Sequence, residues 1–136
     1  MNNIPKRGYL VNIEKETLNN TDYRRVLYTA HNSQLVVMSL HRGEGIGEEV
    51  HHLDQFIRVE QGEAIIILEG ESFPLGADHA AIIPADTKHN VVNSGNEDLK
   101  LYTLYAPPEH KDGTRVATKA DEHEEHFDGT VSKGAE

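Results

Sequence analysis

Short runs of apolar and β-branched residues alternate with glycine, asparagine and acidic residues over most of the chain. Alternation of apolar and polar positions with a period of two is typical of half-buried β-strands. The strands that this pattern predicts are Tyr9–Ile13, Tyr23–Thr29, Leu35–Leu40, Gln55–Glu60, Glu63–Glu69, His79–Ile83, Lys88–Asn93 and Leu99–Tyr105. Many short strands with little helical periodicity favour an all-β barrel or sandwich.

One predicted strand is apolar on both faces, because residues 64–68 read Ala-Ile-Ile-Ile-Leu. One face of such a strand lines the core, and the opposite face needs a separate cover. A second copy of the chain is the simplest cover, so we expect a homodimer. Phe56 and Arg58 have outward parity on the preceding strand, and we expect them to lie in that interface.

The character of the chain changes after Pro107 and Pro108. Residues 109–136 are polar and acidic, with one short helix expected around Thr118–Phe127. We expect this segment to be a loosely packed or disordered tail, attached to a barrel domain of residues 1–108, rather than a second domain.

Composition and charge exclude several classes of function. The length of 136 residues suits one domain, and 37% hydrophobic residues are enough for a core. The formal net charge of −10 repels phosphate backbones and anionic lipids, so neither nucleic acid nor a membrane is an expected partner. The absence of cysteine excludes disulfides and thiolate metal sites. Because the N-terminal residues lack the apolar core of a signal peptide, we expect a cytoplasmic protein.

Side chains with metal-ligand chemistry share one face of the segment that leads into the fourth predicted strand. Glu49, His51 and Gln55 all have odd positions, so the two-residue period of a strand projects them to one side. Ile57 and Val59 continue this face as apolar residues. The pattern therefore predicts a carboxylate, an imidazole and an amide oxygen above a hydrophobic barrel floor.

A second segment supplies another imidazole. His89 lies at the start of a later predicted strand, directly after a turn that begins at Pro84. We predict that Glu49, His51, Gln55 and His89 are the ligands of one metal ion. Two imidazoles, a carboxylate and an amide oxygen suit a borderline divalent ion such as Zn, Mn, Fe, Ni or Co.

Other side chains leave alternatives open. His52 has outward parity, but a bulge in this loop could exchange it with His51 as a ligand. Tyr105 has the parity of the inward-facing residues of its strand, so its hydroxyl is a candidate general acid. The alternative for Tyr105 is a core aromatic residue with a satisfied hydroxyl. His123 and His126 are interpreted as solvated tail residues rather than a second metal site.

These residues resemble the two motifs of the cupin superfamily. The first motif runs Gly, five residues, His-x-His, three or four residues, Glu, six residues, Gly. The second runs Gly, five residues, Pro-x-Gly, two residues, His, three residues, Asn. The positions that correspond in this chain are Gly43, Glu49, His51, Gln55 and Gly62 in the first motif and Pro84, His89 and Asn93 in the second.

The departures from these motifs are specific. Glu49 stands at the first histidine position and Gln55 at the glutamate position, while Asp78 and Asp86 stand where the second motif has glycine. The usual three histidines and one glutamate carry one negative charge. This set also carries one, because Glu49 supplies the charge that Gln55 lacks. The retained balance favours metal binding over a degenerate barrel without metal.

The resemblance implies a single-domain double-stranded β-helix, or jelly-roll barrel. Residues 54–58 and 105–110 look like small cupins of the mannose-6-phosphate isomerase-like type. By analogy with such proteins, we expect a metal-dependent enzyme of the isomerase, lyase or tautomerase type, acting on a small sugar-like or oxygenated substrate. The alternatives are a cupin that binds a small ligand without catalysis and a metal-dependent dioxygenase.

Overall fold

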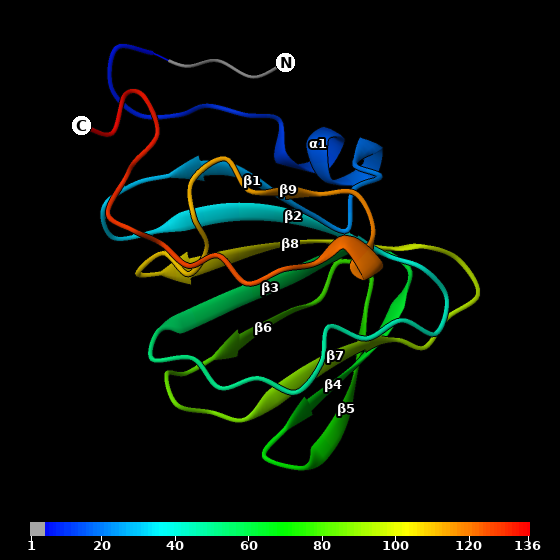
Figure 1. The fold of residues 1–136 in the computed structure, drawn as a ribbon. Coiled ribbons are helices and arrows are strands. Elements are labelled where there is room, and N and C mark those ends of the chain that lie inside the picture. The colour runs from blue at the N-terminus through cyan, green and yellow to red at the C-terminus, as the bar shows by residue number, and fades with distance from the viewer. Residues whose placement is uncertain (1–4) are drawn as a thin grey trace.

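The computed structural model describes residues 5–136, in which nine strands form two antiparallel sheets (Figure 1). The strands are β1 (Arg24–Thr29), β2 (Gln34–Leu40), β3 (Asp54–Gln61), β4 (Glu63–Leu68), β5 (Glu71–Gly76), β6 (Ala80–Ile83), β7 (His89–Asn93), β8 (Leu99–Ala106) and β9 (Arg115–Val116). The larger sheet has the order β6-β3-β8-β2-β1-β9, and the smaller has the order β5-β4-β7. This arrangement confirms the all-β prediction. Residues 1–4, at the start of the expected barrel domain, lie outside the described residues.

The core lies between the two sheets and follows the predicted alternation. On β8, Leu101 and Thr103 are fully buried, and Tyr105 is only 3% exposed. Ile57 and Val59 of β3 are also fully buried, as their parity predicted. The largest fully buried aliphatic side chains are Met38, Leu40, Ile57, Ile83, Leu99 and Leu101. Since each such side chain stabilises the fold by about 1.5–3 kcal/mol, this core supports the strands that carry the candidate site.

The N-terminal region differs from the prediction. The strand expected at Tyr9–Ile13 is wrong, because residues 9–12 are irregular apart from a single bridge residue, Leu10, and the helix α1 (Ile13–Asn19) begins at Ile13. The side chain of Asn12 caps this helix by accepting a hydrogen bond from the backbone N–H of Lys15. Two acidic residues in the first turn add a favourable interaction with the helix dipole. Among the described residues, no helix has the length and apolar content needed to cross a membrane.

Strand β5 was absent from the predicted set. Most of its residues are exposed, and it contains Pro74, which cannot donate a ladder hydrogen bond. It forms the edge of the smaller sheet, where it pairs only with β4. On β4 itself, Ala64 and Ile66 are buried in the core, while Ile65 and Ile67 on the opposite face are half-buried.

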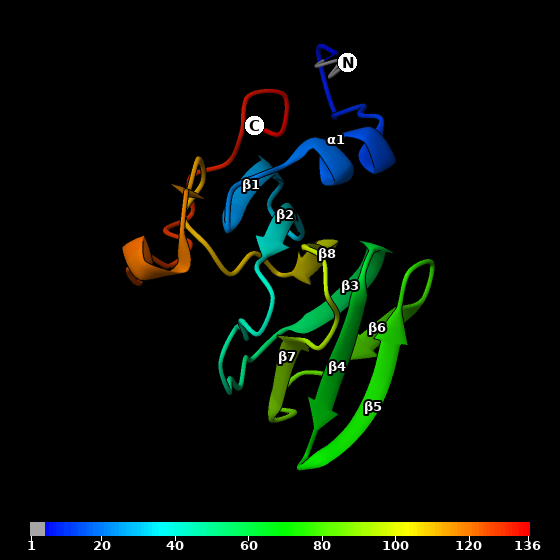
Figure 2. The ribbon, with the colours of Figure 1, turned by 90° about the vertical axis from the view of Figure 1, so that its right-hand side faces the viewer.

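The C-terminal segment runs across the larger sheet and one end of the barrel (Figures 1 and 2). Its short strand β9 pairs with β1, and Val116 is buried. Of the helix expected around Thr118–Phe127, only the short 3-10 helix Lys119–Asp121 forms. Further on, the backbone N–H of Ser132 donates to the carbonyl of Thr29 (2.8 Å). The segment is therefore tied to the barrel along its length.

Candidate metal site

The loop between β2 and β3 positions two of the predicted ligands. It runs antiparallel to β7, with isolated bridges that pair Gly45 with Val92 and Glu49 with His89. The backbone N–H of Glu49 donates to the carbonyl of His89 (2.8 Å), and the N–H of His89 donates back to Glu49 (2.9 Å). This reciprocal pair holds the two residues opposite each other, although they are far apart in the sequence.

Two aspartates replace motif glycines without loss of the backbone conformation that glycine favours. Asp78 has φ 68° and Asp86 has φ 67°, both in the left-handed region. Aspartate enters this region more readily than most residues other than glycine. The backbone N–H of Asp86 donates to the carbonyl of His51 (2.7 Å). The turn before β7 therefore also supports the loop that carries His51.

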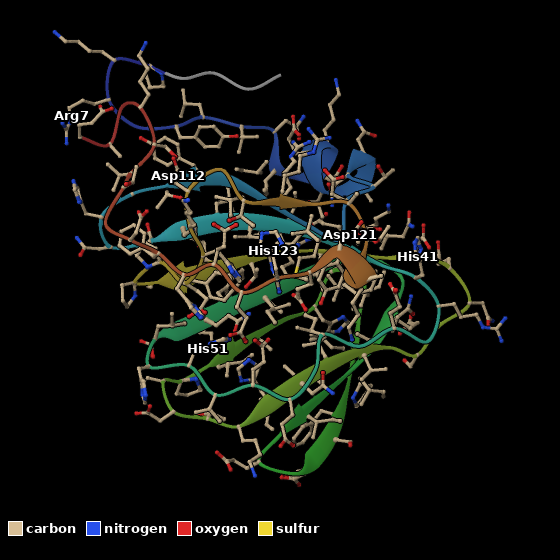
Figure 3. All side chains as sticks on the ribbon, viewed as in Figure 1. Arg7, His41, His51, Asp112, Asp121 and His123 are labelled. Carbon is tan, nitrogen blue, oxygen red and sulfur yellow. The ribbon has the colours of Figure 1, made fainter. Side chains whose placement is uncertain are left out.

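Three of the four predicted ligands form a compact cluster at the open end of the barrel. Glu49, His51 and His89 each offer one ligand atom, and these atoms all lie within 4.8 Å of one another. His51 Nε2 lies 3.7 Å from Glu49 Oε2, and the two imidazole centroids are 5.3 Å apart. Figure 3 labels His51 on the loop that leads into β3. The cluster could hold a metal ion.

The polar contacts of both imidazoles leave the same ring atom available. Nδ1 of His89 lies 2.9 Å from the carbonyl oxygen of Thr87, which can only accept, so Nδ1 carries the proton. Nδ1 of His51 faces Glu109 Oε1 at 3.5 Å. A carbonyl or carboxylate that orients one ring nitrogen while the other binds metal is a common feature of metal-ligating histidines. Nε2 of each ring is therefore the expected ligand atom.

Gln55 adds an unpaired oxygen beside the cluster. It is 4% exposed, and its Nε2 donates to Thr103 Oγ1 (3.1 Å). Its Oε1 is buried and has no hydrogen-bond partner. Gln55 also lines a small recess together with Glu49 and His89. A buried unpaired acceptor costs about 1–3 kcal/mol, and coordination to a cation would remove that cost. The residues thus fit a divalent ion, and coordination by all four stays a prediction.

Burial shifts the pKa values of two of these ligands in opposite directions. Burial raises the pKa of Glu49, against the opposing effects of Arg24 and His89. Burial also lowers the pKa of His51, although the carboxylate of Glu109 acts in the opposite direction. The lowered pKa favours the neutral imidazole, which is the form that binds metal.

The two other candidate residues, His52 and Tyr105, lie in different surroundings. The side chain of His52 is 94% exposed and pairs with Asp86, away from the cluster. Tyr105 lies beside the site, with its ring edge-on to His51 at a centroid distance of 6.0 Å. Burial raises the pKa of Tyr105, so its hydroxyl keeps its proton. Its role as a general acid stays a prediction. The imidazole of His126 contacts Glu109 (3.1 Å).

Sequence reasoning missed several residues that the fold brings to the site. A cavity of about 70 Å³ adjoins the cluster at Glu49, which is one of its lining residues. Its other lining residues are Arg24, Glu109, His110 and residues 122–126. The sequence contained one signal for Arg24, because its position has the same parity as the inward-facing Val26, which indicates an inward side chain. Glu109 and His110 follow the end of the barrel, and no spacing rule relates them to the ligands.

Acid is expected to destabilise the metal-free protein through His110. Burial, followed by Arg24 and His51, lowers the pKa of His110 to about 3, against about 6.5 for a solvated histidine. Between these values the unfolded chain binds a proton that folded His110 does not. The free energy of unfolding should therefore fall as pH drops below about 6.5, by up to about 1.4 kcal/mol per pH unit. Urea unfolding should show a weaker pH dependence for His110→Gln; equal slopes for the two proteins would contradict this assignment.

Comparison with known proteins supports the resemblance to cupins that the sequence motifs indicated. Residues 36–105 match a family model described as Cupin domain. Uncharacterized protein YrkC of Bacillus subtilis (strain 168) is 44% identical over 122 residues, which are 85% of this chain and 66% of that protein. The crystal structure of BH2720 from Bacillus halodurans has 46% identity and a TM-score of 0.82, with coverage of 84% of this chain and 92% of that chain. KdgF from Halomonas sp. has 27% identity and a TM-score of 0.59, with coverage of 65% and 79%.

Proposed function

Because the chain belongs to the cupin family, we propose that it binds one divalent metal ion and acts as an enzyme of non-redox chemistry on a small oxygenated substrate. The proposed ligands are Glu49, His51, Gln55 and His89. The observation that carries the proposal is the arrangement of the two imidazoles. Each has its Nδ1 beside an oxygen acceptor, which leaves Nε2 for the cluster with Glu49.

A divalent ion at this position would polarise a carbonyl or hydroxyl oxygen of the substrate. The proposed proton acceptor is Glu109, a carboxylate that lines the cavity beside Glu49 and whose side chain is 15% exposed. Its other contribution is to orient His51. His110 lines the same cavity, and its lowered pKa keeps it neutral, so it serves as a hydrogen-bonding group rather than a charged acid.

The substrate class follows from the polarity of the site. Carboxylates and imidazoles dominate the lining of the cavity, and its volume of about 70 Å³ is far below the roughly 300–1,000 Å³ of sites for drug-sized ligands. We propose a small substrate rich in oxygen. The likeness of residues 54–58 and 105–110 to cupins of the mannose-6-phosphate isomerase-like type favours a sugar-like molecule.

Hydrogen exchange in D₂O tests the enzymatic part of the proposal. Isomerases and tautomerases commonly begin by removing a proton beside a carbonyl, so NMR should show exchange at that carbon in one member of a panel of small ketoses, aldoses and 2-oxo acids. The exchange should need added Zn or Mn and should be lost in Glu109→Gln. A metal-loaded protein that exchanges no panel member would indicate a binding module. Oxygen uptake that depends on ferrous iron would indicate a dioxygenase.

We also propose that the chain forms a homodimer. The expected interface combined the outer face of β4 with Phe56 and Arg58, but β4 and β3 lie in different sheets, so we propose the outer face of the larger sheet instead. Phe56 on β3 lies between Ile82 on β6 and Leu104 on β8 in the strand register. Ile82 is 69% exposed and Leu104 is 37% exposed, so these side chains form an apolar row at the surface. Arg58, expected in the interface, pairs within the chain with Glu60 (2.6 Å).

Replacement of Ile82 by arginine should weaken the dimer by more than about tenfold, because an unpaired charge buried in an apolar interface costs several kcal/mol. Light scattering coupled to size-exclusion chromatography would measure the mass. Leu10→Arg is a matched control, since Leu10 is 61% exposed and far from the apolar row in sequence. A wild-type chain that elutes as a monomer at all concentrations would exclude the dimer.

A further inference from the structure

A buried guanidinium lines the cavity that adjoins the candidate metal cluster at Glu49. Arg24 is 5% exposed, and its Cζ lies 5.3 Å from the ring centroid of Tyr23. Its position on β1 places it beside the cavity that Glu49 and His110 also line. Among residues 5–136, Arg24 is the only lysine or arginine in that lining. A buried arginine beside a reaction site is well suited to hold an anionic group.

The hydrogen-bonding capacity of Arg24 is only partly used. Its Nη1 donates to the carboxylate of Glu122. Its Nε is buried and has no hydrogen-bond partner. A guanidinium carries five donors in a planar fork that matches the two oxygens of a carboxylate. Because Nε has no acceptor, an anion that accepted from Nε as well as from an Nη would use more of these donors than Glu122 does.

The carboxylate that Arg24 binds in this structure, that of Glu122, comes from the surface of the molecule. Glu122 follows the 3-10 helix Lys119–Asp121, and its side chain is 30% exposed. Residues 122–125 form neither helix nor strand. The nearby side chains of His123 and Glu124 are 64% and 90% exposed. Figure 3 labels Asp121 and His123 on this part of the segment. Glu122 thus brings a partly exposed carboxylate to a buried arginine from an irregular stretch of the C-terminal segment.

The other carboxylates of the cavity have basic partners of their own. Glu109 contacts His51 and His126, and Glu125 contacts Lys111 and His123. Glu122 is the carboxylate that pairs with Arg24, so its displacement would leave the guanidinium free to bind another anion. An incoming carboxylate could take its place on Arg24, and the released carboxylate of Glu122, whose side chain is already 30% exposed, would be solvated by water.

We propose that Arg24 recognises a carboxylate on the substrate, and that Glu122 occupies this position until the substrate displaces it. The proposal rests on the proposed function, because it names the substrate class of that site. Arg24 and Glu49 line the same cavity, so a carboxylate held by Arg24 would place the neighbouring oxygens of a small acid towards the cluster. The favoured class is a small hydroxy acid or oxo acid.

Glycolate and glycolamide test this recognition, because they differ in one group, which is a carboxylate in glycolate and a neutral amide in glycolamide. Isothermal titration of the zinc-loaded protein should show that glycolate binds more tightly than glycolamide. Glu122→Gln should increase the affinity for glycolate by about tenfold, since the internal carboxylate no longer competes, and should leave glycolamide unchanged. Asp128→Asn is the matched control, since it removes an exposed carboxylate of the same segment that lies outside the cavity lining, and it should have no effect.

Arg24→Met should abolish the preference for glycolate while the weak binding of glycolamide persists. A gain of affinity in Glu122→Gln cannot arise from misfolding, so that variant keeps the test decisive if Arg24→Met is unstable. Equal binding of the two probes by wild type and Glu122→Gln, or no binding of millimolar glycolate by either, would overturn the proposal. So would a preference for glycolate that survives in Arg24→Met.

Elemental analysis of the same samples separates this proposal from the proposed function. If the protein binds no metal but Glu122→Gln still enhances glycolate binding, the metal site is wrong and the recognition by Arg24 stands. If metal is bound at one ion per chain but Glu122→Gln has no effect on glycolate, only the recognition by Arg24 fails.

Discussion

Alanine at His51 should reduce the affinity for metal by at least about hundredfold, whereas alanine at the adjacent His52 should leave it unchanged. Loss of a partner that only orients a ligand typically costs 10–100-fold in affinity, and loss of the ligand itself should cost more. The two histidines are neighbours in the sequence but face different surroundings. His51 Nε2 lies 3.7 Å from Glu49, whereas the side chain of His52 is 94% exposed.

Elemental analysis of protein purified without added metal, followed by titration with Zn, would measure this difference. The expected result is one ion per chain in the wild type and in His52→Ala, and almost none in His51→Ala or His89→Ala. Circular dichroism would show that the variants are folded. Full metal content in both His51→Ala and His89→Ala would contradict the ligand set, and loss of metal in His52→Ala would point to the alternative ligand.

Removal of the metal should lower the midpoint of thermal unfolding by about 10 °C. The proposed ligands come from the loop before β3, from β3 in the larger sheet and from β7 in the smaller sheet, so the ion would connect both sheets. A ligand at one hundred times its dissociation constant stabilises the folded state by about 2.7 kcal/mol. For a domain of this size, each kcal/mol corresponds to a few degrees.

Calorimetry of the chelator-treated protein, before and after addition of Zn, would measure this shift. His89→Ala is the appropriate control, because it should unfold at the same temperature with and without Zn. An identical midpoint for the treated and reloaded wild type would show that the cluster does not bind the ion in the folded state. A shift of equal size in His89→Ala would place the bound metal elsewhere.

Local periodicity predicted much of the fold because it depends only on neighbouring residues. The parity of β8 placed Leu101, Thr103 and Tyr105 inside the barrel, and all three are buried. The same argument grouped Glu49, His51 and Gln55 on one side. Errors arose where local signals conflicted. At α1, the capping residue Asn12 outweighs a short apolar run. At β5, the mostly exposed edge strand with Pro74 lacks a clear alternation of apolar and polar residues.

The sequence by itself determined the all-β class, the inward faces of the strands and the four candidate ligands, because a period of two and the chemistry of side chains are local properties. Only the tertiary structure decided which additional residues surround those ligands. Arg24 comes from β1, and Glu109 and Glu122 come from the segment after β8, so their meeting depends on strand order and on the path of that segment across the barrel. No residue spacing contains that information, since it follows from the packing of the whole chain.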